Sequence, residues 1–181
     1  MKKSVGLIEV SSISKGIAIL DDIVKRLEVD VLVARSICPG KYMILLQGNT
    51  SSVRIAVCIG DELGQKYITK SCIIDNINTH IFSVMKGKIE PENMDALGVI
   101  ETKNVVSSII IADIVWDSSD VELIKIKLGN GIGGKGLLAF TGNVSSVKNA
   151  IEHCKSKDEV YQTIFNCQII NYPNIITINS I

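Results

Sequence analysis

The chain repeats itself, and this repeat constrains the fold more than any single motif does. The segment VGLIEVSSIS at residues 5–14 matches LGVIETKNVV at 97–106, and GKYMILLQGNTSSVRIA at 40–56 matches GKGLLAFTGNVSSVKNA at 134–150. The spacing between equivalent residues grows from 92 to 94 between these blocks, so the second copy carries two inserted residues. Self-similarity of this kind is typical of duplicated structural units.

The two copies predict one domain over residues 1–90 and a second over residues 95–181. The boundary falls in the polar segment KGKIEPENMDA at 86–96, which contains Pro91. We place the inserted residues at a turn, where RSICPGK of the first copy becomes LGNGIGGK of the second. No low-complexity linker separates the copies, so we expect two similar domains in tandem.

Each copy predicts the same order of elements: strand, helix, strand, strand, helix, strand. The alternation of apolar runs, three-and-four spacing and cap residues supports this order. In the first helix the apolar residues at that spacing are Ile13, Ile17, Leu20, Val24 and Leu27. The expected ranges are 4–10, 12–27, 29–37, 41–47, 51–66 and 70–77, then 96–102, 104–117, 121–128, 136–141, 145–155 and 164–171. This order predicts an α+β protein made of two ferredoxin-like β-α-β-β-α-β domains.

Composition and charge exclude several classes of partner. Lysine plus arginine and aspartate plus glutamate each number 19, so no net field draws the chain to nucleic acid or an anionic membrane. The longest apolar run, VVSSIIIADIVW, contains Asp113 and is too short to span a bilayer. Glu9 interrupts the N-terminal apolar stretch too early for a signal peptide. We therefore expect a soluble, cytoplasmic protein with no nucleic-acid or membrane partner.

The five cysteines show no C-x-x-C pair and no zinc-ligand spacing. Cys58 and Cys154 fall in helical patterns, while Cys72 and Cys167 fall in strand-like runs. For these four we expect small buried hydrophobic side chains, because free cysteine is commonly buried. Only Cys38 is placed differently.

No motif predicts enzyme chemistry. GNGIGG at 129–134 formally fits G-x-G-x-x-G, but a strand follows it instead of the helix that nucleotide binding requires. His80 and His153 have no identifiable acid or nucleophile partner, so we expect them at the surface or at helix caps. Glu9 and Glu101 are equivalent in the repeat, which indicates a shared structural role. We expect that the protein is not an enzyme.

Cys38 stands in the sequence SICPGK. Pro39 and Gly40 favour a type II turn, because proline presets the first central residue and glycine accepts a positive φ at the second. Cys38 is then at a hairpin tip, where its thiol is exposed and free to ionise and bind a soft metal. One cysteine cannot hold a metal cluster unaided. A hairpin tip at a three-fold axis would bring three copies together.

The repeat and its motifs resemble the bacterial microcompartment shell-protein family, in its tandem-domain, trimer-forming branch. The residues that carry the resemblance are VGLIEVSSISKGIAILDDIVK, VDVLVARSICPGK, ALGVIET and GIGGKGLLAFTGNVSSVKNAI, which span most of residues 4–156. The likeness is greatest to propanediol-utilisation shell proteins that carry an iron–sulfur centre, through ICPGK and GIGGK. The segment after about residue 157 matches poorly.

The resemblance implies a homotrimer that forms a pseudo-hexameric tile, which meets other microcompartment shell proteins and possible lumen enzymes. It implies one [4Fe–4S] cluster per trimer, with Cys38 of three chains as the metal ligands, serving electron transfer or cluster delivery. It also implies a central pore. The residues that would line that pore are Ser36, Ile37, Cys38, Pro39, Gly40, Asn130, Gly131, Ile132, Gly133 and Gly134. Asn130 is equivalent to Cys38 by plain offset, so the second copy brings no cysteine.

Lys25 matches the lysine that the family places at tile edges. The second copy departs from the pattern, because Trp116 and Asp117 occupy that region. A solvated helix end is the other interpretation of Lys25.

Two further functions stay open at this point. One is a tile whose pore conducts metabolites and holds no cluster. The other is a small-molecule sensor built from duplicated ferredoxin-like domains. The sequence also leaves open which metabolic pathway is enclosed and which face of a tile points to the lumen.

Overall fold

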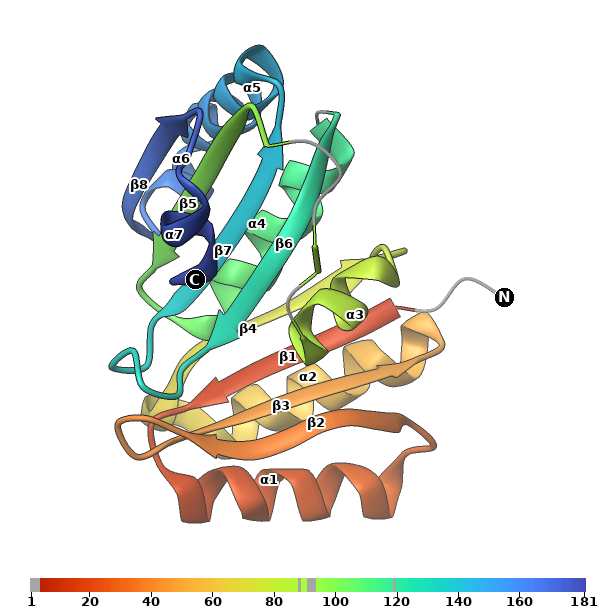
Figure 1. The fold of residues 1–181 in the computed structure, drawn as a ribbon. Coiled ribbons are helices and arrows are strands. Elements are labelled where there is room, and N and C mark those ends of the chain that lie inside the picture. The colour runs from red at the N-terminus through yellow and green to blue at the C-terminus, as the bar shows by residue number, and fades with distance from the viewer. Residues whose placement is uncertain (1–3, 88, 91–93, 119) are drawn as a thin grey trace. The chain divides into compact units, whose positions relative to one another are not determined.

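The computed structural model describes residues 4–87, 89–90, 94–118 and 120–181 (Figure 1). Contacts divide the chain into two compact units: residues 1–77 with 129–134, and residues 78–128 with 135–181. Of the predicted boundary segment 86–96, residues 88 and 91–93 lie outside the described residues. Each unit contains one four-stranded sheet, so the duplicated sequence forms one fold twice.

The first unit has the predicted order of elements. Its sheet has the strand order β2-β3-β1-β4, and every neighbouring pair is antiparallel. Strands β1 and β2 therefore run parallel with β3 between them, which is the split βαβ arrangement predicted from the sequence. The elements are β1 (Ser4–Val10), α1 (Ile13–Arg26), β2 (Asp30–Ile37), β3 (Lys41–Gly48), α2 (Thr50–Gly64), the short 3₁₀ helix η1 (Gln65–Tyr67) and β4 (Ile68–Asp75).

The second unit repeats this topology with the strand order β6-β7-β5-β8. The α+β fold of two tandem domains is confirmed. Helices α3, α6 and α7, like η1 in the first unit, are too short to give a clear apolar period and were not predicted. The elements are α3 (His80–Lys86), β5 (Ala96–Thr102), α4 (Val105–Ser118), β6 (Val121–Leu128), β7 (Gly136–Gly142), α5 (Val144–Ser156), α6 (Asp158–Tyr161), β8 (Ile164–Asn171) and α7 (Ile175–Asn179).

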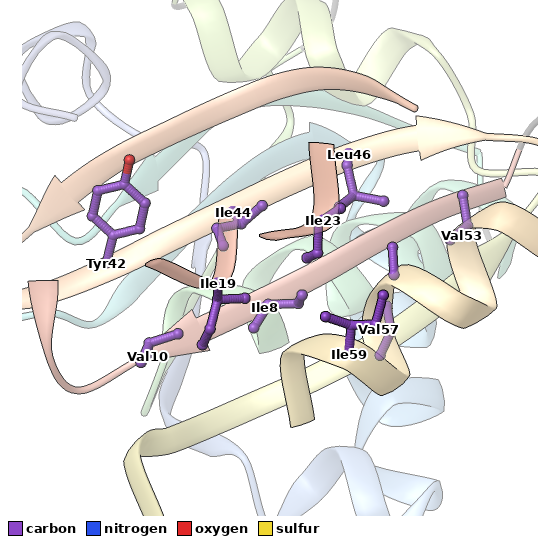
Figure 2. Packing of buried hydrophobic residues seen from close by; sticks show 11 residues of the cluster. Ile8, Val10, Ile19, Ile23, Tyr42, Ile44, Leu46, Val53, Val57 and Ile59 are labelled. Atoms are coloured by element: carbon purple, nitrogen blue, oxygen red, sulfur yellow. The ribbon is translucent and has the colours of Figure 1, made fainter. Parts of the chain in front are cut away.

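In the first unit, α1 and α2 pack on the same face of the sheet (Figure 2). Ile8 of β1 and Ile44 of β3 face each other in register and contribute to this core. Ile19 of α1 and Val53 of α2 are fully buried against them. Burying side chains of this size stabilises the fold by about 1.5–3 kcal/mol each. The core therefore holds the first hairpin, β2–β3, on a rigid support.

The apolar residues whose spacing predicted α1 are not the ones that this helix buries most. Ile13, Ile17 and Val24 are exposed, whereas Gly16, Ile19 and Ile23 are the buried positions. A Cβ at Gly16 would lie only 2.5 Å from the Cβ of Tyr42. The helix therefore approaches the sheet through its glycine, and this close approach selects which part of its broad apolar stripe is buried.

The helix caps repeat between the copies. Asn49 accepts a 2.8 Å hydrogen bond from the Ser52 N–H at the start of α2, and Asn143 accepts one of 2.8 Å from the Ser146 N–H at the start of α5. Both asparagines stand in equivalent segments of the repeat, GNTSSV and GNVSSV. Each cap satisfies a backbone donor that the first helical turn leaves free.

The two inserted residues lie in the hairpin turn of the second copy. The β2–β3 and β6–β7 ladders share a register irregularity, between Val31 and Val33 and between Leu123 and Lys125. From there both ladders run without a gap to the turn. In the repeat, Ile37 is equivalent to Gly129 and Lys41 is equivalent to Lys135. Between these positions the turn has residues 38–40 in the first copy and residues 130–134 in the second. Pairing is thus conserved, and the length difference is confined to the tip.

Candidate functional site

The structure places Cys38 at the tip of the β2–β3 hairpin. Ile37, the last residue of β2, is buried, while Cys38, Pro39 and Gly40 form an exposed turn before β3 begins at Lys41. The Cys38–Pro39 peptide bond is cis, and Gly40 has a φ of 74°. The predicted display of Cys38 and the predicted positive φ of Gly40 are both confirmed. The thiol is therefore accessible in a single chain.

An ion pair ties the base of this turn to the neighbouring strand. Lys41 Nζ donates a 2.9 Å hydrogen bond to the Glu9 carboxylate, which is fully buried. Charged groups are buried almost only when they are paired and hydrogen-bonded. The structural role predicted for Glu9 is confirmed, and its effect is to hold the residue that follows Gly40.

The same pair recurs in the second copy. Lys135 Nζ donates to Glu101 at 3.0 Å, and the lysine lies 3.6 Å from the centroid of the Phe165 ring. A cation over an aromatic face is attracted by the electron density of the ring. Sequence reasoning missed both lysines, although the repeated glycine–lysine pairs at 40–41 and 134–135 were a signal for them.

The glycine-rich turn of the second copy belongs to the first compact unit. Gly129, Gly131, Gly133 and Gly134 all have positive φ values, between 65° and 77°. The Gly134 N–H donates to the Gly129 carbonyl at 3.2 Å and closes the loop. The structure confirms that a strand and not a helix follows GNGIGG, since β7 begins at Gly136.

Of the predicted pore-lining residues, Ser36 lies near the end of β2 and is exposed. In the second turn Asn130, Gly131 and Gly133 are exposed, Ile132 is half-buried and Gly134 is buried. Within the unit, the backbone of Gly134 approaches the Cys38 carbonyl group. The structure thus brings the two predicted segments together at their turns.

Lys25 lies in the last turn of α1 and is exposed. Its ammonium group is 2.5 Å from the Asp21 carboxylate one turn earlier. The hydrogen bond to Asp21 and the charge of that carboxylate raise the pKa of Lys25 above its usual value. The lysine therefore remains charged and available at the surface of the single chain.

The surface position predicted for the histidines is confirmed for His153 but not for His80, which is half-buried. His153 is exposed near the end of α5, where it lines a shallow groove with Asp113, Asp117 and Lys157. His80 is the first residue of α3, and its ring centroid is 4.7 Å from that of Trp116. Trp116 thus packs against His80.

The prediction for the other cysteines is wrong for Cys58, which is exposed on α2. The helix packs through Val53, Ala56 and Gly60, and Cys58 points about a quarter-turn or more away from that face. Cys154 is buried, and Cys72 and Cys167 are partly buried. Burial raises the pKa of Cys72 to about 12 and that of Cys154 to about 11, so these thiols are poor metal ligands at neutral pH.

One chain offers this site a single thiol. Within residues 4–87, 89–90, 94–118 and 120–181, no three histidine, cysteine, aspartate or glutamate side chains are grouped so as to hold a metal ion. In the same ranges, no helix has both the length and the apolar character that crossing a membrane requires. An exposed thiol at a rigidly supported turn fits one ligand position of a cluster that several chains share.

Comparison with known proteins identifies relatives along nearly the whole chain. The bacterial microcompartment shell protein PduT of Citrobacter freundii is 32% identical over 151 residues, which cover 83% of this chain and 82% of that protein. A crystal structure of a microcompartments protein from Desulfitobacterium hafniense DCB has a TM-score of 0.81 at 30% identity, covering 96% of this chain and 97% of that chain.

A more distant structure shares the fold alone. The fused permuted hexameric shell protein MSM0275 from the RMM microcompartment has a TM-score of 0.64 at 19% identity, covering 88% of this chain and 84% of that chain. The family described as the BMC domain matches residues 4–77 and again residues 96–173. These two matches coincide with the two copies of the sequence repeat. The chain therefore belongs to the BMC-domain family of bacterial microcompartment shell proteins, and it carries two of these domains in tandem.

Proposed function

We propose that this shell protein assembles as a homotrimer, a pseudo-hexameric tile whose centre holds one [4Fe–4S] cluster. Cys38 of each chain would supply one thiolate. The single observation that carries the proposal is the exposed Cys38 at the tip of a turn whose counterpart in the second copy has no cysteine. Three-fold assembly converts one thiol per chain into three converging ligands.

Alternating turns would line the centre of the tile. Residues 36–40 come from the first domain and residues 130–134 from the second. A [4Fe–4S] cluster, when bound there, supplies one-electron redox chemistry. The chain's own part is to present three thiols, to leave one iron without a cysteine from this segment, and to close the pore around them. Such a tile serves electron transfer across the shell or delivery of the cluster, and no enzymatic activity is proposed.

Lys25 is proposed as a contact between tile edges. It is exposed, charged and placed at the end of a surface helix. Its equivalent in the second copy is Asp117, which is also exposed. The two kinds of edge therefore differ in charge, and neighbouring shell proteins would meet a lysine on one and an aspartate on the other.

The test is anaerobic purification, followed by iron–sulfur reconstitution and iron analysis. Wild-type protein is expected to be brown, with four irons for every three chains. Cys38→Ser is expected to be colourless. Cys58→Ser is the matched control, because Cys58 is also exposed but lies on α2, away from the turn. It should keep the cluster.

Each other outcome has a defined meaning. A colourless wild type after reconstitution would sink the cluster and leave the open, metabolite-conducting tile. A cluster retained in Cys38→Ser would sink the ligand assignment. A chain that stays monomeric by light scattering at every concentration tested would sink the tile and favour the sensor of small molecules.

A further inference from the structure

We infer that the glycine-rich turn of the second domain positions the cysteine turn of the first, with Gly134 and Gly129 as positioning residues for the Cys38 thiol. The inference rests on the proposed function, since it concerns the same thiol. Both turns lie in one compact unit, residues 1–77 with 129–134. The second copy, whose turn has no cysteine, would thus position the cysteine of the first copy.

Gly134 lies directly on the Cys38–Pro39 peptide. A Cβ built on Gly134 would meet the Cys38 carbonyl oxygen, and it would lie 2.9 Å from Pro39 Cδ and 3.3 Å from the Cys38 carbonyl carbon. Any other residue must push this peptide away, because the closest atoms belong to the Cys38 backbone and to the proline ring, and neither can rotate aside. The contact is therefore available to glycine alone at this position.

Gly129 makes the corresponding contact one residue earlier. Its added Cβ would lie 2.7 Å from Ile37 Cβ and 3.1 Å from Ile37 Cγ2. Ile37 is buried and ends β2. Because the Gly134 N–H donates to the Gly129 carbonyl, the two glycines form one closed base. Gly129 contacts Ile37, which precedes Cys38, and Gly134 contacts the Cys38–Pro39 peptide.

The tip of the same loop has no such contacts. A Cβ on Gly131 or Gly133 would meet no atom within 4 Å, although their φ values are 73° and 65°. Gly134 has a φ of 77°, so all three positions share the same left-handed backbone. Alanine at 131 and at 134 therefore meets the same left-handed backbone, and alanine at 134 meets the Cys38–Pro39 peptide as well.

Position matters because three thiols must converge on one cluster. A ligand set works only when its members are held within about 0.5 Å of the productive geometry. Cys38 is exposed, so its place depends on the backbone that carries it. Lys41 and Glu9 hold the far side of the turn, and Gly129 and Gly134 support the near side.

The experiment compares Gly134→Ala with Gly131→Ala in the full chain. For each we would measure trimer formation, iron per trimer after reconstitution, the electron paramagnetic resonance spectrum of the reduced protein, and amide hydrogen exchange over residues 37–41 in cluster-free protein. Gly131→Ala measures the effect of the backbone strain alone, and it should change each readout less than Gly134→Ala does. Gly134→Ala should remain trimeric, lose about fivefold in iron content or change its spectrum, and exchange about threefold faster over 37–41.

Equal iron content and equal exchange in the two variants would overturn the inference. If Gly134→Ala does not fold, Gly129→Ala against Gly133→Ala repeats the comparison with the same expectations. Loss of fold in both contact variants, with both tip variants folded, also overturns it, because the contacts then hold the domain together instead of positioning the thiol. A wild type without a cluster is a failure of the proposed function, and the exchange measurement still decides the positioning.

Discussion

Lys41 and Glu9 form an ion pair of 2.9 Å in which the carboxylate is fully buried, and Lys135 and Glu101 form its duplicate at 3.0 Å with both side chains about one-third exposed. The geometry is the same in both copies, but the surroundings differ. Removing one partner of a buried pair withdraws a compensating charge in the interior, whereas solvent screens an exposed pair. The first pair should therefore matter much more for stability.

Replacing Lys41 by methionine should lower the free energy of unfolding by about 3 kcal/mol, and Lys135→Met by less than about 1 kcal/mol. Urea unfolding at one fixed protein concentration measures both. The two variants make the same chemical change at equivalent positions, so each controls for the other. Equal losses would show that burial does not decide the value of these pairs.

The cysteines should differ in reactivity in the folded chain. Cys72 has a pKa of about 12. At pH 8 its ionised fraction is therefore about a thousandfold smaller than that of an ordinary thiol. Cys154, with a pKa of about 11, follows the same rule. Iodoacetamide labelling read by peptide mass spectrometry should modify the exposed Cys58 much faster than these two. Labelling of all five in urea is the control, and fast labelling of Cys72 in the folded chain would contradict its burial.

Asp113 should make the stability of the second domain depend on acid pH. Desolvation raises the pKa of this half-buried carboxyl, the nearby Asp117 carboxylate raises it further, and the Asn78 N–H partly opposes both. The folded state thus binds the proton of Asp113 more tightly than the unfolded state does. The contribution of the protonated Asp113 to the free energy of unfolding is full below pH 3.8 and is lost as pH rises through the folded-state pKa.

Asp113→Asn removes that loss and should stabilise the protein by about 0.5 kcal/mol at neutral pH, a small effect because solvent screens half of the group. The gain should vanish below the ordinary aspartate pKa. Thermal unfolding at several pH values measures it. The equivalent Asp21→Asn is the control and should bring no gain, because Asp21 pairs with Lys25 at 2.5 Å. A gain of equal size at Asp21 would refute the explanation.

Gly16→Ala should destabilise the first domain although alanine favours helices. The added methyl would lie 2.5 Å from Tyr42 Cβ, so α1 must move off the sheet. Overpacking of this kind costs about 1–3 kcal/mol, more than the gain of about 1 kcal/mol in helix propensity. Gly87→Ala is the control, because no atom lies within 4 Å of its added Cβ. Chemical unfolding compares them, and a stabilised Gly16→Ala would contradict the close packing.

Lys25→Ala should leave the thermal unfolding midpoint unchanged and reduce the assembly of tiles into sheets. The side chain is exposed and pairs only with Asp21 on its own helix among the ion pairs seen in the described residues. Electron microscopy of concentrated protein shows whether sheets form. Lys148→Ala removes another exposed lysine, one paired with Glu152 on α5, and should assemble normally. Normal sheets from Lys25→Ala would remove this residue from the proposed edge.

The repeat predicted the architecture well because both copies had to satisfy the same pattern. Strand β8, Ile164–Asn171, was predicted residue for residue, and the inserted residues were placed correctly at the second turn. The buried part of α1 was not, because the apolar stripe of this helix is broader than its contact with the sheet, and Gly16 decides which part makes that contact. Cys58 was misplaced because its position on α2 depends on which neighbours pack, a property of the tertiary structure.

The site was predicted in part. The display of Cys38 followed from local turn chemistry, which acts over four residues and needs no tertiary contact. The lysine partners of Glu9 and Glu101 were missed because each pair joins residues more than thirty positions apart. The close approach of Gly134 to Cys38 is likewise a contact between distant segments, and composition alone does not reveal it.

The duplication has a consequence for stoichiometry. A ring built from separate single-domain chains must sort two unlike subunits by affinity alone, and mixtures with two, four or six thiols would compete with the intended one. Joining the cysteine-bearing turn and the glycine-bearing turn in one polypeptide fixes their ratio at synthesis and their alternation at assembly. Every trimer of this chain would therefore carry three of these thiols, because the two kinds of turn are covalently joined.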